Sequence, residues 1–274
     1  MHKFHCDEQK CVSCGQCARD CLLSLLSMES GHPVMTVPEK CIGCLHCFAI
    51  CPTGAIRLDD YRPEEAPGPR PLPSLEQARA FAFQRRSIRR FKRENCDPVL
   101  IRGIMEDAFS APSGVNQRLL LASAIIDGEV MDSFRRLLYA GIKKIAASPD
   151  SPLTRLIHIL GEDKDEETWI KEDKVLRGAP HFVACSHSRR AITGEPDCFI
   201  YLSLFEELAV AAGIGTVWCG YLTHCLKAMP ALREFAGVTP DYQIGYSMLF
   251  GAPDVKYARG VRRRPAKIFI ASKP

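Results

Sequence analysis

The feature that most constrains this chain is a cysteine spacing that occurs twice near its N-terminus. Both runs read C-x2-C-x2-C-x3-C, and they comprise Cys11, Cys14, Cys17 and Cys21, then Cys41, Cys44, Cys47 and Cys51. Closely spaced cysteines on one tight loop can direct three thiolates at one [4Fe–4S] cluster. The alternatives are zinc and disulfides, but zinc sites usually use two separated pairs of ligands. The runs therefore predict two [4Fe–4S] clusters and a protein that transfers single electrons.

The fourth cysteine of each run faces away from its own loop, and in two-cluster ferredoxins it binds the other cluster. We therefore expect one cluster on Cys11, Cys14, Cys17 and Cys51, and the other on Cys41, Cys44, Cys47 and Cys21. The two runs form an internal repeat at an offset of 30 residues. One departure is visible, because Leu22 stands where the second run has Pro52.

Composition narrows the class of protein. The 274 residues suffice for one large domain or two unequal ones, and a net charge of +4 requires no nucleic-acid or membrane partner. Fourteen cysteines suit a reducing compartment, and the polar N-terminus argues against export, so we expect a cytoplasmic protein. The uncharged stretch 208–226 is interrupted by glycines, which favours a buried helix and a loop over a membrane span.

A proline-rich stretch separates two parts of the chain. Residues 61–74 contain five prolines, which predicts a stiff, extended linker. Residues 1–60 then form a ferredoxin-type module with two clusters. This module has little apolar core, so its clusters hold it together. Residues 75–274 form the second domain.

Apolar periodicity in the second domain predicts helices and strands without the G-x-G-x-x-G turn of a dinucleotide-binding unit. We expect helices at 75–84, 98–110, 131–147, 198–212 and 223–235, and strands at 119–126, 180–186, 242–251 and 267–271. The polar stretch 148–174 is expected to form a mobile lid. Short strands are expected in the cluster module at 34–37 and 55–58.

Two basic segments lie far apart in the sequence. The first reads RRSIRRF from Arg85, and the second reads KYARGVRRRP from Lys256. Arginine side chains and a serine hydroxyl suit a phosphate group, so the segments are candidates for one shared phosphate site. Taken alone, each is more typical of a solvated surface, and neither is interleaved with the aromatic residues of a nucleic-acid site.

Four motifs in order give the second domain a resemblance. RRSIRRF, then Ala111–Asn116 (APSGVN), then Gly213–Trp218 (GIGTVW), then GAP with KYARGVRR, together resemble the nitroreductase family over residues 80–265. The resemblance implies an α+β fold in which helices flank a central antiparallel sheet. It also implies a homodimer with FMN at the dimer interface. A ferredoxin module fused to this domain resembles a known subgroup of the family.

The resemblance also implies cofactor-binding residues, but no catalytic side chain. The phosphate and ribityl end of FMN would contact Arg85, Arg86, Ser87, Arg89, Arg259 and Arg263, with Arg262 as a competing register. Pro112, Ser113 and Asn116 would lie against the flavin, usually from the other subunit. The loop from Gly213 to Gly220 would present backbone amides near the flavin N5, and the loop residues assigned to the cofactor are Gly215, Thr216, Trp218, Cys219 and Gly220. We interpret Cys219 as a packing residue, because no histidine base is implied nearby.

The chain departs from the family after Asn116. The family often continues with one variable residue and then Gln-Pro-Trp, whereas this chain reads Gln117-Arg118-Leu119, so that Arg118 replaces the expected glutamine and the Pro-Trp is absent. The additional arginine suggests an anionic substrate as a hypothesis.

The combination predicts an iron–sulfur flavoprotein oxidoreductase. Electrons would pass from a ferredoxin-like or NAD(P)H donor through two [4Fe–4S] clusters to FMN, which would reduce a small organic acceptor such as a nitroaromatic or a quinone. The alternative is an electron carrier or redox sensor that does not turn over a substrate repeatedly.

Overall fold

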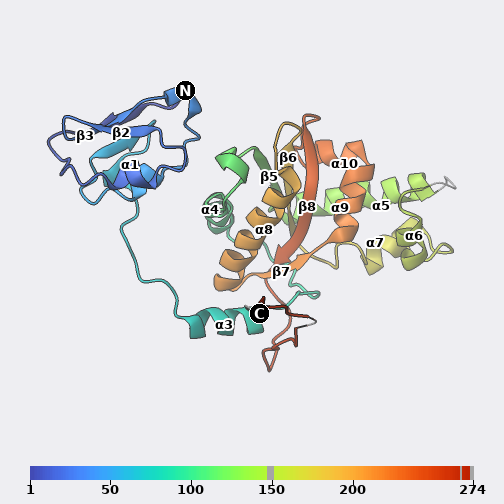
Figure 1. Cartoon of the computed structure of the whole chain (residues 1–274). Coiled ribbons are helices and arrows are strands. Elements are labelled where there is room, and N and C mark those ends of the chain that lie inside the picture. Colours follow the sequence, from blue (N-terminus) through green and yellow to red (C-terminus); the bar gives the residue numbers. More distant parts are fainter. Residues whose placement is uncertain (147–150, 266, 272–274) are drawn as a thin grey trace. The chain divides into compact units, whose positions relative to one another are not determined.

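The computed structural model of this chain describes residues 1–146, 151–265 and 267–271 (Figure 1). The chain divides into two compact units. The first unit is Met1–Leu72 with Val115–Gln117, and the second is Pro73–Gly114 with Arg118–Pro274. Among the described residues, no helix is both long and apolar enough to cross a membrane.

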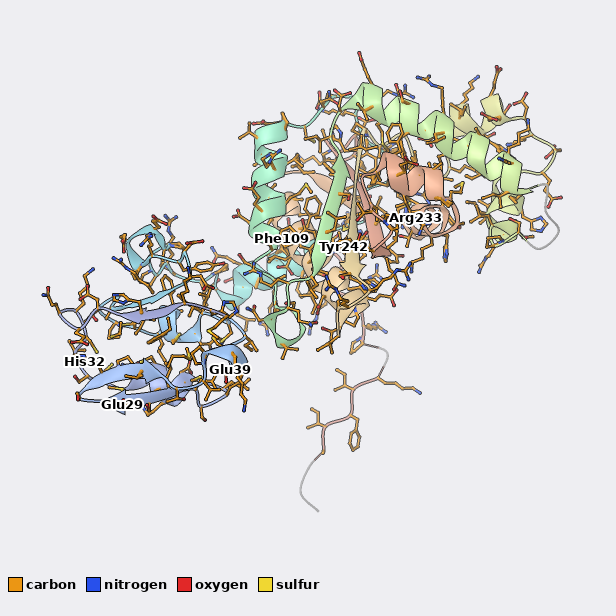
Figure 2. All side chains as sticks on the ribbon, turned by 90° about the horizontal axis from the view of Figure 1, so that it is seen from above. Glu29, His32, Glu39, Phe109, Arg233 and Tyr242 are labelled. Atoms are coloured by element: carbon orange, nitrogen blue, oxygen red, sulfur yellow. The ribbon has the colours of Figure 1, made fainter. Side chains whose placement is uncertain are left out.

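The first unit contains two antiparallel strand pairs and two short helices. β1 (Phe4–Cys6) pairs with β4 (Ile56–Leu58), and β2 (Leu26–Glu29) pairs with β3 (His32–Met35). Glu29 and His32 are partners at the turn between β2 and β3 (Figure 2). The helices are α1 (Gln16–Asp20) and α2 (His46–Ala49), and a 3-10 turn lies at Pro63–Glu65. The predicted linker therefore begins with a turn instead of being extended throughout.

The 30-residue repeat of the sequence is also a repeat of backbone conformation. Gly15 and Leu45, which precede α1 and α2, both have left-handed backbones, with φ of 65° and 63°. Ser24 and Gly54 form a second such pair, with φ of 53° and 63°. A left-handed residue other than glycine costs about 1–2 kcal/mol. At each of these two positions one run has glycine and the other has a different residue, yet both adopt the same left-handed backbone. The cysteine loops therefore require that backbone shape.

A four-stranded antiparallel sheet forms the centre of the second unit. Its strand order is β5-β6-β8-β7, with β5 (Leu120–Ile125), β6 (His181–Ser188), β7 (Gly215–Trp218) and β8 (Tyr242–Gly251). Almost every residue of β6 and β8 is buried, as expected for strands that are covered on both faces. The predicted antiparallel sheet is confirmed.

Helices cover both faces of this sheet (Figure 1). One side carries α4 (Pro98–Ala108) and α8 (Gly194–Ala211), and the other carries α5 (Gly128–Ala146) and α9 (Gly220–Ala228), with α10 (Pro230–Phe235) packed on both. α3 (Leu75–Gln84) begins with a capping box, in which Ser74 and Gln77 satisfy each other's backbone N–H groups. The helices predicted near residues 75–84, 98–110 and 198–212 are confirmed, with differences of up to four residues at their ends.

The predicted lid is wrong for its described part. Residues 154–160 form α6 (Thr154–Leu160), and residues 166–172 form α7 (Glu166–Glu172). Leu156, Leu160 and Trp169 are buried in the core, because a few apolar residues at helical spacing suffice to anchor a largely charged segment. Residues 147–150, which include the last residue of the predicted helix 131–147, lie outside the described residues.

Three further predictions need correction. The helix expected at 223–235 is two helices, since Pro230 cannot continue α9 and instead begins α10. The loop expected from Gly213 to Gly220 contains β7, which pairs with β8. Residues 267–271 form no strand, and the side chain of Phe269 is 91% exposed. An apolar run without a neighbouring strand to pair with does not form a sheet.

Candidate functional site

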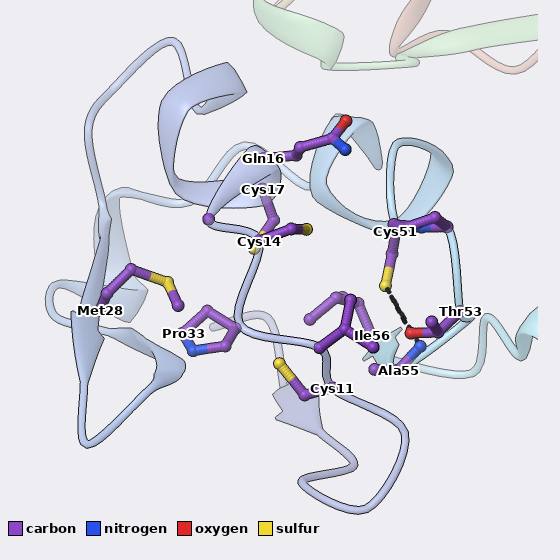
Figure 3. A pocket seen from close by; sticks show the side chains of 13 residues that line it. Cys11, Cys14, Gln16, Cys17, Met28, Pro33, Cys51, Thr53, Ala55 and Ile56 are labelled. Carbon is purple, nitrogen blue, oxygen red and sulfur yellow. Dashed lines mark hydrogen bonds between the residues drawn. The ribbon is translucent and has the colours of Figure 1, made fainter.

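The first candidate site is a cavity lined by cysteines from both runs (Figure 3). Its sulfur-bearing lining comprises Cys11, Cys14, Cys17, Cys51 and Met28. The structure therefore brings Cys51 of the second run to the three loop cysteines of the first, which is the grouping expected from the sequence. Four thiols around one cavity are the donor set that a [4Fe–4S] cluster requires, so these residues fit that cofactor.

The fourth cysteines of the two runs have equivalent surroundings. The Sγ of Cys51 accepts a hydrogen bond from the Ala55 N–H at 3.2 Å, and the Sγ of Cys21 accepts one from the Leu25 N–H at 3.4 Å. Burial alone would raise the pKa of Cys51, but the hydrogen bonds from Ala55 and Thr53 outweigh it and lower the pKa. Donors of this kind stabilise a thiolate, which is the form that binds iron.

The remaining cysteines of the second run follow the pattern of the first. In each run the third cysteine (Cys17, Cys47) is buried, the second (Cys14, Cys44) is exposed and the first is half-buried. Cys17 and Cys47 pack together with Leu26 and Ile56 in the small core of this unit. The second predicted ligand set thus has the local arrangement of the first.

Cys6 is a residue that sequence reasoning left outside both runs. Candidate ligand atoms of Cys6, Cys11 and His32 all lie within 4.8 Å of one another. Burial and the neighbouring Cys11 raise the pKa of Cys6 to about 12. β1 brings Cys6 to this place through its pairing with β4, which no local spacing reveals.

The second candidate site is a pocket that we call the arginine pocket. It is lined by Arg85, Arg86, Ser87, Arg89 and Arg263, with Ala82, Phe83 and Val261. The first basic segment reaches it by running beside β7, where Ser87 forms a parallel bridge with Thr216 and the Ile88 N–H donates to the Thr216 carbonyl at 2.8 Å. The two basic segments therefore converge, as the sequence predicted.

The second basic segment divides between two hollows. The Val261 N–H donates to the Phe83 carbonyl at 2.7 Å, and this contact brings Arg263 to the arginine pocket. Arg259 and Arg262 instead line a neighbouring hollow beside Gly213 and Tyr257. Of the two alternatives considered for the second position, the structure thus places Arg263, and not Arg262, with the first segment.

The arginine pocket has the chemistry of a phosphate site. Four guanidinium groups and one hydroxyl line it, and no carboxylate is among its lining residues. Planar guanidinium groups can bind phosphate oxygens in pairs, so the pocket fits the phosphate end of FMN.

Sequence reasoning missed Glu206, a buried residue of α8 that joins three of the predicted cofactor residues. Its Oε1 accepts hydrogen bonds from the Arg85 guanidinium at 3.1 Å and the Thr216 hydroxyl at 2.9 Å. Its Oε2 accepts one from the Trp218 indole at 3.0 Å. Its side chain is only 9% exposed. The only sequence indication was an acidic residue in a strongly apolar helix.

A third hollow, which we call the α9 hollow, lies at the N-terminal end of α9. It is lined by Arg89, Arg177, Val217, Trp218, Cys219, Gly220, Tyr221 and His224. Trp218, Cys219 and Gly220 were predicted cofactor residues, whereas Arg177, Tyr221 and His224 were not. Arg89 lines both this hollow and the arginine pocket, so the two are adjacent.

Other predicted loop residues have packing roles. Gly215 lies so close to Ile88 that a Cβ atom would approach that side chain to 2.7 Å. The buried Cys219 thiol donates to the Val175 carbonyl at 3.4 Å, and burial raises its pKa to about 11. A protonated thiol is a poor nucleophile, which supports the interpretation of Cys219 as a packing residue.

The APSGVN segment contains a local hydrogen-bond network. The Ser113 hydroxyl accepts from the Arg118 N–H at 3.0 Å, and the Arg118 guanidinium donates to the Phe109 carbonyl at 2.5 Å. Pro112 is exposed and lies in the second unit, whereas Asn116 belongs to the first unit. The contacts predicted for Pro112, Ser113 and Asn116 across a dimer stay predictions.

Two family models match the chain. The model of the nitroreductase family matches residues 82–252, and the model of a 4Fe-4S dicluster domain matches residues 10–56. Together they cover every predicted cluster ligand, the whole α9 hollow, and the arginine pocket except Val261 and Arg263.

Solved structures share the fold of the second unit. A nitroreductase with bound FMN from Bacteroides fragilis aligns with a TM-score of 0.57 and 17% identity over 72% of this chain and 99% of its own. A nitroreductase from Desulfitobacterium hafniense, also with bound FMN, aligns with a TM-score of 0.54 and 21% identity over 70% of this chain and 97% of its own. An FMN-dependent nitroreductase from Mycobacterium smegmatis in complex with NADPH aligns with a TM-score of 0.52 and 20% identity over 66% of this chain and 90% of its own. At these identities the likeness is one of fold.

Curated relatives match the first unit. An uncharacterized ferredoxin from Methanocaldococcus jannaschii is 30% identical over 50 residues, which are 18% of this chain and 81% of the ferredoxin. An archaeal-type glutamate synthase [NADPH] from Thermotoga maritima is 43% identical over 58 residues, which are 20% of this chain. The chain spans only 11% of that synthase, so this match concerns the cysteine-rich part alone.

Proposed function

Since the chain belongs to the nitroreductase family and carries a 4Fe-4S dicluster domain, we propose that it transfers electrons from an external donor to a small organic acceptor. Family and fold make it an FMN-dependent oxidoreductase with two kinds of redox cofactor. The observation that carries the proposal is the arginine pocket, in which Arg263 joins Arg85, Arg86 and Arg89 although more than 170 residues separate them. A solvated basic surface would not need this convergence.

The residues that would hold the cofactors follow from the sites. Cys11, Cys14, Cys17 and Cys51 would hold one cluster, and Cys41, Cys44, Cys47 and Cys21 the other. The arginine pocket would bind the FMN phosphate. The α9 hollow, with the backbone of Trp218, Cys219 and Gly220, would border the flavin ring. Pro112, Ser113 and Asn116 would complete the site across a homodimer interface, and Arg259 would assist from its own hollow.

When bound, the clusters carry single electrons, and FMN exchanges one or two and can deliver a hydride. The chain's own residues bind the phosphate, orient the ring and hold the cluster sulfurs. The proposed donor is a ferredoxin-like protein or NAD(P)H, since the Mycobacterium smegmatis nitroreductase forms a complex with NADPH and the Thermotoga maritima relative is a glutamate synthase [NADPH]. The proposed acceptor is a nitroaromatic, a quinone or a similar compound, and the proposed location is the cytoplasm.

An anaerobic spectrum of the full chain, before and after addition of a donor, tests this proposal. We expect flavin bands over a broad iron–sulfur absorbance, and multi-turnover reduction of nitrobenzamide. Cys21→Ser and Cys51→Ser should each remove one cluster and slow turnover driven by reduced ferredoxin. Turnover driven by NAD(P)H should persist if that donor reduces FMN directly. A chain without flavin bands, or with reduction but no sustained product, would instead be an electron carrier.

A further inference from the structure

Arg177 and His224 line the α9 hollow, and no part of the proposed cofactor chemistry requires either side chain. We infer that this hollow binds the anionic group of an organic carboxylate acceptor, and that Arg177 is the residue that selects it. The inference rests on the proposed function in one respect, since the hollow must border the flavin for a bound carboxylate to be an acceptor. Anion binding itself follows from the hollow alone.

The charges of the hollow are unbalanced. Arg89, Arg177 and His224 line it, and no aspartate or glutamate is among its lining residues. Within the described residues, neither the Arg177 nor the Arg89 guanidinium has an ion pair or a hydrogen bond. Because Arg89 is assigned to the FMN phosphate, Arg177 is the cation of this hollow that is left to attract a further anion, and no carboxylate lining the hollow pairs with it.

Arg85 and Arg118 differ from Arg177, because their guanidinium groups already have partners. The guanidinium of Arg85 is paired with Glu206, and that of Arg118 donates to the Phe109 carbonyl. The sequence suggested Arg118 as a determinant of anionic substrates, but its guanidinium has a local partner and does not line the α9 hollow. The structure therefore transfers that role from Arg118 to Arg177.

A buried network holds the turn that presents Arg177. The carboxylate of Asp173 accepts hydrogen bonds from the Arg135 guanidinium at 2.9 Å and from the Gly178 N–H at 2.8 Å. The Tyr139 hydroxyl also donates to it, at 2.9 Å. Asp173 and Arg177 themselves have left-handed backbones, with φ of 43° and 55°. Such conformations persist only where surrounding contacts enforce them, so the exposed Arg177 stands on a rigid support.

The lining of the hollow narrows the class of ligand. Arginine forms paired hydrogen bonds with a planar carboxylate, and the first N–H groups of α9 add a partial positive charge. Trp218 and Tyr221 provide aromatic surface beside these cations. A small aromatic acid presents both an anionic group and an apolar ring, and it therefore fits better than an inorganic anion.

Calorimetric titration of the FMN-loaded full chain with 4-nitrobenzoate and with the neutral 4-nitrobenzamide tests the inference. We expect the wild type to bind the carboxylate at least tenfold more tightly, because one hydrogen bond between charged groups is worth about tenfold to a hundredfold in affinity. Arg177→Met should abolish this preference, and Arg177→Lys should retain part of it. Arg136→Met is the matched control, since Arg136 is an exposed arginine of α5 that lines neither site.

The inference is overturned if the wild type binds both compounds equally, if the preference survives Arg177→Met, or if Arg118→Met abolishes it instead. It is also overturned if NADPH binding, and not nitrobenzoate binding, is lost in Arg177→Met, since the anion would then be a nucleotide phosphate. Turnover of the two compounds separates this result from the proposed function. A carboxylate preference without any turnover would support the anion site and contradict the oxidoreductase proposal.

Discussion

Replacement of Glu206 by glutamine is the sharpest test of how the predicted cofactor residues Arg85, Thr216 and Trp218 are held together. Glutamine keeps the shape of the side chain, and its Oε1 can still accept from Arg85 and Thr216, as the Oε1 of Glu206 does. Its Nε2 then replaces the Oε2 that accepts from the Trp218 indole, so that two donors face each other. Rotation of the amide would be worse, because Nε2 would then face two donors.

The expected destabilisation follows from these contacts. Loss of a hydrogen bond to a charged acceptor costs about 1.5–3 kcal/mol. The Arg85 side chain is 30% exposed, so loss of its charged partner adds only about 0–1 kcal/mol. We therefore expect Glu206→Gln to lower the free energy of unfolding of the second unit by about 1.5–4 kcal/mol.

The two tryptophans of the chain provide the assay. Trp169 and Trp218 both lie in the second unit, so tryptophan fluorescence during an anaerobic urea titration reports the unfolding of that unit alone. Glu207→Gln is the matched control, because the next residue of α8 is an exposed glutamate whose replacement should change stability by less than about 0.5 kcal/mol. A Glu206→Gln transition that coincides with that of Glu207→Gln would refute the reasoning.

Two further predictions concern the phosphate site and the effect of pH. Arg263→Ala should weaken FMN binding about tenfold to a hundredfold, and the adjacent Arg262→Ala less than about threefold, because only Arg263 lines the arginine pocket. Equilibrium dialysis measures both, and equal losses would contradict the assignment. Burial lowers the pKa of His181 from 6.5 to about 4, so the unfolded chain binds a proton there that the folded chain does not. Protonation of this group in the unfolded chain should therefore lower the free energy of unfolding by about 2 kcal/mol when the pH falls from 7 to 5. His181→Gln, which keeps an acceptor for the Cys96 N–H, should remove that component in urea titrations at the two pH values; an unchanged difference would disprove it.

The sequence was enough to predict those helices and strands whose boundaries depend only on residues within the same segment. The boundaries of α3 and β8 follow from the residues of those segments, since the Ser74 cap and the apolar run of 242–251 are local features. The prediction at 267–271 failed because strand formation depends on a partner strand, which one segment cannot reveal. The lid prediction at 148–174 failed because average polarity conceals a few anchoring residues such as Trp169.

The sequence by itself predicted the redox cofactors, because the cysteines of each run and the arginines of the first basic segment follow one another within a few residues. Tertiary structure decided which of these groups act together. Pairing across β7 and the contact of Val261 with Phe83 separate Arg263 from Arg262, although the two are adjacent in the chain. The position of Glu206 in α8 makes it a shared hydrogen-bond acceptor, and the hydrogen bonds of Asp173 hold the turn that presents Arg177. These roles depend on distances between residues that are remote in sequence, which only the folded chain defines.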